Sequence, residues 1–282
     1  MMNDTVARPG TPVSGAANPG PAETRHPGRL RGEAMMTIQT RKAQALFHGR
    51  RRTEDREAII GLARFASLSH LIWQAAAADD PFADWMLLQI ETTLSDTHGA
   101  IREAVGAYQE RLSAIPAIEI EVAYSVEPVR VPLSFSTVYG YQGAYLLTDF
   151  DELVRTVLTA MHVGLEPRGT GRELIERHAR AIRRTFLLPT RWKYKGVTRE
   201  DVEQMNARAL DAIAAMASMG ELPAAVLAGE RRANHAPEIR KPTRPTTTDT
   251  AEVGASAADD EADAGDDDGA SEAGAVGEDR PE

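Results

Sequence analysis

Positive side chains are concentrated between residues 168 and 199, where ten Lys or Arg stand against two Glu, a local net charge of +8. Three of the arginines, Arg177, Arg180 and Arg184, recur at the spacing that places side chains on one stripe of a helix. Arg172 falls on the flank of the same helix. Cations neutralise phosphates, and the counterions released are the main sequence-independent source of affinity for DNA. The cluster therefore predicts a surface that binds a nucleic acid backbone.

One end of this cluster has the pattern of a helix start. Thr170 and Glu173 match a capping box, in which a Thr side chain and an acidic side chain satisfy N–H groups of the first turn. N–H groups that stay free at such a start, here near Gly171 and Arg172, bind phosphate readily. The spacing thus predicts a phosphate site at Thr170–Arg172.

At the other end, charged and aromatic residues alternate: Arg191, Trp192, Lys193, Tyr194 and Lys195. A strand there would put three cations on one face and two aromatic rings on the other. The alternative is an Arg-rich helix that is merely exposed to solvent, followed by two rings that face the core. Under either interpretation base specificity does not follow, because backbone contacts position a protein without reading sequence.

Signals for catalysis or for a cofactor are missing. The chain has no Cys, no Walker-type glycine loop, no Gly-x-Ser-x-Gly, no His-Glu-x-x-His and no ligand-like spacing among its seven histidines. Asp79 and Asp80, like Asp149 and Asp151, occupy positions that helix capping explains. His178 lies on an apolar helix face, as a core residue would. We therefore expect no enzyme activity, no metal site and no cofactor.

Charge and composition divide the chain. The net charge is −10, but residues 245–282 hold 13 acids and one Arg, so the remainder carries +2. This acidic tail and the Pro- and Gly-rich residues 1–34 have too few large apolar side chains to fold, and we expect both to be disordered. The tail would either compete with DNA for the basic surface or only solubilise the protein. No membrane span or signal peptide is recognisable, which predicts a cytoplasmic protein.

Between the tails, helical periodicity over residues 59–115 predicts an αα-hairpin that breaks at Asp79-Asp80-Pro81, after a basic lead-in at 35–58. Trp73 and Trp85 would pack inside it. Residues 116–219 predict a core in which a strand precedes two helices, and residues 220–244 a trailer. The elements expected in the core are strands at 118–122, 129–135 and 139–147 and helices at 149–163, 170–186 and 198–219. The fold class is then α+β and mainly helical.

Five segments in this order resemble a family of proteins carried on integrating conjugative elements, which is related to AcaB-like transcriptional regulators. The segments are Thr40–Arg51, Glu127–Phe135, Tyr139–Leu146, His162–Leu165 and Gly196–Asp201. The likeness covers about residues 36–242.

The resemblance implies a ribbon-helix-helix module that acts as a homodimer on double-stranded DNA. Two chains would each supply one strand of an antiparallel ribbon for the major groove. Matched to this sequence, the strand is Tyr141–Leu147, with Gln142 as the main reader of bases and Tyr141 and Tyr145 as helpers. Ribbons of this kind usually present more polar or basic side chains than this segment has.

The combined hypothesis is a DNA-binding regulatory or accessory protein of an integrating conjugative element, without a membrane partner or a small-molecule substrate. The alternatives are a structural adaptor of the transfer machinery that does not bind DNA, a relaxosome accessory DNA binder and, less well supported, an enzyme. The residues expected to contact DNA are Tyr141, Gln142, Tyr145, Thr170, Arg172, Arg177, Arg180, Arg184, Arg191, Lys193 and Lys195.

Overall fold

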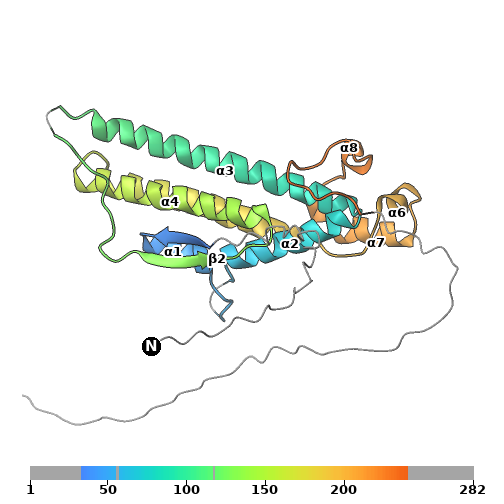
Figure 1. Cartoon of the computed structure of the whole chain (residues 1–282). Helices are drawn as coiled ribbons and strands as arrows, with labels where there is room; N and C mark the ends of the chain where they lie inside the picture. Colours follow the sequence, from blue (N-terminus) through green and yellow to red (C-terminus); the bar gives the residue numbers. More distant parts are fainter. Residues whose placement is uncertain (1–32, 55–56, 117, 241–282) are drawn as a thin grey trace, which may run out of the picture. The chain divides into compact units, whose positions relative to one another are not determined.

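The described part of the chain is mainly helical, with a small antiparallel sheet of two strands (Figure 1). The computed structural model describes residues 33–54, 57–116 and 118–240, so nearly all of the two ends predicted to be disordered lies outside it. Within these residues no helix has the length and apolar character needed to cross a membrane. The elements are β1 (Ala34–Ile38), α1 (Arg41–His48), α2 (Leu62–Ala77), α3 (Pro81–Ser113), β2 (Val129–Leu133), α4 (Val138–His162), α5 (Arg168–Leu187), η1 (Leu188–Arg191), α6 (Arg199–Glu203), α7 (Ala207–Ala215), η2 (Ala217–Met219) and α8 (Ala224–Leu227).

The predicted αα-hairpin is confirmed, because α2 and α3 pack against each other. Asp80 caps α3 by accepting hydrogen bonds from the backbone N–H groups of Phe82 (2.9 Å) and Ala83 (3.1 Å). Pro81 occupies the first turn, where its missing N–H costs nothing. The chain reverses at Asp79, whose φ is 70°. This tight turn places acidic side chains at the start of α3.

The strand predicted at residues 139–147 is wrong, because these residues form the first half of α4. Gly143 explains the error: a Cβ there would lie 2.7 Å from Leu62 Cδ1 and 3.1 Å from Phe65 Cε1. The glycine lets α4 approach α2 closely, whereas in the sequence it resembles a strand boundary. The apolar residues around it are buried at helical spacing.

The helix start predicted at Thr148 or Asp149 is also wrong, since both residues lie inside α4. Asp151 nevertheless binds backbone N–H groups, but those of a distant segment. Its carboxylate accepts hydrogen bonds from the backbone N–H groups of Gln39 (2.7 Å) and Thr40 (2.9 Å), immediately before α1. The acidic residue thus ties α4 to the junction between β1 and α1.

The predicted edge strand beginning at Val129 is confirmed as β2, and its antiparallel partner is β1. The segment expected to be a basic lead-in therefore contains most of a strand and a whole helix, β1 and α1. The strand predicted at residues 118–122 is wrong, since this segment belongs to no sheet of the described part. The chain just beyond it lies along α4, where Ala123 N–H donates to Thr159 Oγ1 (3.0 Å).

The order strand–helix–helix occurs twice, as β1–α1–α2 and as β2–α4–α5, with α3 between the two units. The strands pair with each other, α1 contacts both α4 and α5, and α2 contacts α4. Phe65 of α2 stacks on Phe186 of α5 with 4.8 Å between ring centroids. The predicted βαα unit with its strand at 139–147 is therefore not found; the strand before α4 and α5 begins at Val129, and a second strand–helix–helix order precedes it.

The helix predicted from Thr198 to Met219 begins as expected, with Thr198 and Asp201 forming a capping box. It is then interrupted at Met205, which has a φ of 49°, and continues as α7 and η2. The described part of the trailer is fixed to the αα-hairpin by hydrogen bonds. Trp73 Nε1 donates to the carbonyl oxygen of His235 (3.1 Å), and Arg240 N–H donates to that of Ala77 (2.8 Å).

Candidate nucleic-acid interface

The arginine stripe predicted on α5 is present. Arg177, Arg180 and Arg184 are exposed, and none of them has a carboxylate partner among the described residues. The opposite face of α5 is buried, and it includes Ile175 and His178 as the sequence indicated. Burial, together with the nearby positive charge of Arg177, lowers the pKa of His178, which favours a neutral core histidine.

The N-terminus of α5 differs in detail from the prediction. The helix starts at Arg168 with Pro167 as N-cap, so Thr170 lies in the first turn and the predicted capping box does not form. No side chain caps this end, which leaves N–H groups of the first turn available to an anion. Arg168 and Arg172 are both exposed here. The predicted phosphate site is thus uncapped and flanked by two cations.

The segment Arg191–Lys195 is not a strand. It leaves η1 in an extended conformation in which Trp192 is buried and Tyr194 is 72% exposed, with 6.0 Å between the centroids of the two rings. Lys195 pairs with Asp211 (2.8 Å), whereas Arg191 and Lys193 have no carboxylate partner among the described residues. Since α5 is roughly 30 Å long, this segment and the N-terminus of α5 lie at opposite ends of the helix.

Lys193 lies beside a second group of cations, and the sequence analysis did not predict that these residues would come together. Together with Arg50, Arg51 and Arg64 it lines a cavity of about 560 Å³ at the start of α2. The N-cap of α2 is Gly61, which offers no side-chain cap. The cations of the predicted basic cluster therefore do not form a single patch. They lie near two uncapped helix starts, those of α2 and α5, and along the arginine stripe between them.

A close contact between glycines fixes the start of α2. A Cβ on Gly61 would lie 2.5 Å from the carbonyl oxygen of Phe47, and one on Gly49, whose φ is 70°, would lie 2.3 Å from that of Ile59. The loop is further closed by Arg50 and Ile59, which exchange two backbone hydrogen bonds of 2.8 Å. The first turn of α2 is thereby held against the end of α1.

The β1–β2 ribbon has one buried face and one exposed face. Met36 and Ile38 point into the core, while the alternate positions face outward, as the period of two requires. The exposed side chains include Thr37 and Arg130, which are direct cross-strand partners. Sequence reasoning missed this face, because Thr37 alone interrupts the apolar residues of β1 and the strand shows no clear alternation.

The three residues predicted to read bases are not on the ribbon. Tyr141, Gln142 and Tyr145 lie on α4, where Tyr141 packs edge-on against Phe135 with 5.3 Å between ring centroids. Gln142 is half-buried and Tyr145 is 58% exposed. No strand presents them to a groove, so their predicted role as base readers has lost its structural basis.

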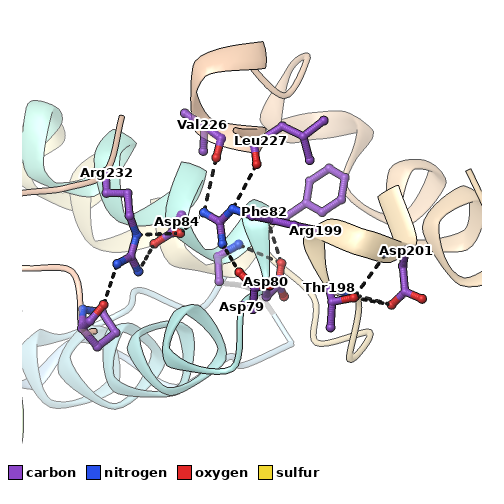
Figure 2. Close-up of polar contacts among 12 residues, drawn as sticks. Asp79, Asp80, Phe82, Asp84, Thr198, Arg199, Asp201, Val226, Leu227 and Arg232 are labelled. Atoms are coloured by element: carbon purple, nitrogen blue, oxygen red, sulfur yellow. Dashed lines mark hydrogen bonds and ion pairs between the residues drawn. The ribbon is translucent and has the colours of Figure 1, made fainter. Parts of the chain in front are cut away.

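Arg199, at the end of the predicted basic cluster, is held in an internal charge network (Figure 2). Its guanidinium pairs with Asp79 (2.5 Å) and with Asp84, and it donates to the carbonyl oxygens of Leu227 (3.0 Å) and Val226 (3.3 Å). Burial disfavours its charge, but the bonds to Asp84 and Asp79 outweigh this and raise the pKa of Arg199. This arginine is therefore unavailable to DNA.

Asp84 is fully buried, and its carboxylate also accepts hydrogen bonds from Nε (2.9 Å) and Nη2 (2.8 Å) of Arg232. Figure 2 shows the two guanidinium groups converging on this carboxylate from different segments of the chain. Burial raises the pKa of the neighbouring Asp80 to about 6, although hydrogen bonds from the N–H groups of Ala83 and Phe82 oppose the shift. The network joins the start of α3 to residues 226–232.

Comparison with known proteins gave two matches. The sequence matches the family profile described as transcriptional regulator AcaB over residues 26–240. The crystal structure of selenomethionine-containing AcaB from uropathogenic E. coli is similar at 12% sequence identity, covering 72% of this chain and 97% of that one, with a TM-score of 0.47. Curated protein sequences gave no match. Because the profile spans more than half of the 282 residues, the chain belongs to the AcaB family of transcriptional regulators.

Proposed function

We propose that this regulator acts by binding double-stranded DNA, with the β1–β2 ribbon in the major groove and the starts of α2 and α5 on flanking phosphates. The observation that carries the proposal is the doubled βαα order. Its two strands pair with each other, and the second helix of each unit begins without a side-chain cap. Proteins that read DNA with paired strands use a ribbon of this kind.

The exposed face of the ribbon has the chemistry needed to read bases. The major groove admits a two-stranded ribbon, and an arginine there can donate two hydrogen bonds to guanine. Arg130 is the basic side chain of this face, and Thr37 directly opposite can donate or accept. Met35 and Pro132, the next exposed pair, are apolar and suit contact with a thymine methyl group.

The phosphate contacts would come from both helix starts. At α5 they are the free N–H groups of the first turn, which includes Thr170, with Arg168 and Arg172 beside them. At α2 they are the N–H groups after Gly61, with Arg64 and Lys193 lining the adjoining cavity. Two such anchors would fix the ribbon in the groove without themselves reading sequence.

The other predicted cations take a lesser part in this proposal. Arg177, Arg180 and Arg184 extend the positive surface along α5, where they would attract DNA without specificity. Arg191 would act similarly near the start of α2, whereas Lys195 is engaged with Asp211. From the resemblance we extend the proposal to transfer genes of an integrating conjugative element, and to a homodimer that places two ribbons on one DNA.

Fluorescence anisotropy with a duplex selected from a random library, and with an unselected duplex, tests the proposal. We expect Arg130→Gln to weaken binding to the selected duplex by about 1–3 kcal/mol and to leave the unselected one nearly unchanged. Arg172→Gln should weaken both and lower the salt slope of log Kobs by about one. The matched control is Arg231→Gln, which changes an exposed arginine outside the proposed interface. Absence of binding to any duplex at low salt would refute the proposal and favour an adaptor.

A further inference from the structure

A cavity of about 530 Å³ lies between the junction of β1 with α1, the C-terminal half of α4 and the first turns of α5. Its size falls within the range of about 300–1,000 Å³ that is usual for small-molecule sites. Such sites are mostly apolar, with a few polar groups that fix the orientation of the ligand. The side chains around this cavity divide in the same way, into an apolar floor and a charged rim.

The floor consists of Val154 and Leu158 from α4 and Ile175 from α5. Val154 and Ile175 are buried, with 1% and 4% of their surface exposed. Leu158 keeps 45% of its surface exposed on a helix whose neighbouring apolar residues are covered. Covering this leucine would remove apolar surface from water, which favours an occupant with an apolar body.

The rim is positive. Glu176 is already engaged, because it pairs with Lys42 and with Arg183 (3.5 Å), and the hydrogen bond from Lys42 lowers its pKa. Arg41 and Arg172 have no carboxylate partner among the described residues. At the start of α1, Asp151 accepts from the N–H groups of Gln39 and Thr40 and Thr40 caps Ala43 N–H, which leaves the N–H groups of Arg41 and Lys42 to an acceptor. Charge complementarity therefore selects an anion.

We propose that this cavity binds a small amphipathic anion, a carboxylate with an aliphatic or aromatic body. The body lies on Leu158 and Ile175, and the anionic group lies between Arg41 and Arg172. Arg172 is also assigned to DNA phosphate above, so the ligand and the duplex compete for one guanidinium group. This competition rests on the proposed function, whereas binding of the ligand does not. The cavity would then make DNA binding responsive to a metabolite.

Isothermal titration of the full chain with decanoate, below its micelle concentration, tests the site. Decyltrimethylammonium has the same tail with the opposite charge and serves as the ligand control. We expect decanoate to bind and the cation not to bind. Leu158→Asp should weaken decanoate about tenfold or more, because it removes apolar contact and adds a repelling charge. The matched control is Leu210→Asp, which alters a leucine of α7 that is 54% exposed, and it should leave the affinity unchanged.

Four results would overturn the inference: no decanoate binding, equal binding of the two ligands, an unchanged affinity in Leu158→Asp, or an equal loss in Leu210→Asp. Because Leu158 is 45% exposed, its variant should fold, and circular dichroism checks this. The proposed competition between ligand and DNA predicts that decanoate releases the wild-type protein, but not the Leu158→Asp variant, from DNA. If decanoate releases neither protein, the proposed competition is wrong. Should the wild type fail to bind DNA at all, the proposed function fails, and the titration still decides the site.

Discussion

Replacing Asp84 by Asn tests whether the internal charge network holds residues 226–232 to the αα-hairpin. The Asp84 side chain is fully buried, and the side chains of its partners Arg199 and Arg232 are only 11% and 20% exposed. Removing one partner of a buried pair leaves the other charge uncompensated, at a cost of about 3–5 kcal/mol. Asn retains one oxygen that can accept from one arginine, so the lower end, about 3 kcal/mol, is the expected loss of unfolding free energy.

Urea unfolding followed by tryptophan fluorescence measures this loss, and thermal unfolding gives a second reading. At about 2–4 °C per kcal/mol for a domain of this size, the Tm should fall by roughly 6–12 °C. The control is Asp211→Asn, which breaks the pair with Lys195 at a carboxylate that is 63% exposed, and it should cost less than about 1 kcal/mol. A loss below about 1 kcal/mol in Asp84→Asn would refute the assignment of a structural role to the network.

Three further predictions concern pH, packing and the acidic tail. The pKa of Asp80 is about 6 in the folded state, above its unfolded value, so its contribution to stability is present at low pH and lost as pH rises through 6. Asp80→Asn should therefore be more stable than wild type at pH 7, by an amount on the order of 2 kcal/mol that vanishes near pH 4 in pH-dependent unfolding. Gly143→Ala should cost about 1–3 kcal/mol by crowding Leu62 and Phe65, whereas Gly99→Ala, where a Cβ meets open space, should stabilise α3 by up to about 1 kcal/mol in the same assay. Deleting residues 245–282 should raise DNA affinity at low salt if the tail competes for the basic surface; an unchanged affinity would leave solubilisation as its role.

The sequence was sufficient where local chemistry decides the structure. Asp80 and Pro81 start α3 as expected, and the helix expected from Thr198 begins there, capped by Thr198 and Asp201. Each of these depends on groups within a few residues of one another. The buried face of α5 and the arginine stripe on its exposed side were predictable for the same reason, because one helical period fixes both.

The sequence was insufficient where distant segments decide. Whether Gly143 marks a strand end or a close helix contact depends on Leu62 and Phe65, more than 70 residues earlier. The partner of β2 is β1, nearly 100 residues away, so a ribbon formed within one chain could not be read from either strand alone. Likewise, Lys193 joins the cations at the start of α2 only through the packing of η1 on that helix.

Pairing β1 with β2 inside a single chain makes assembly of the sheet a first-order step that dilution does not reverse. The two strands are also encoded separately, so a substitution such as one at Thr37 is not copied onto the opposite strand, where Arg130 stands. Each edge can therefore change independently during evolution. Under the proposed function, the half-site read by one ribbon need not itself be a palindrome, because its two strands differ in sequence, whereas two identical strands favour a symmetric site.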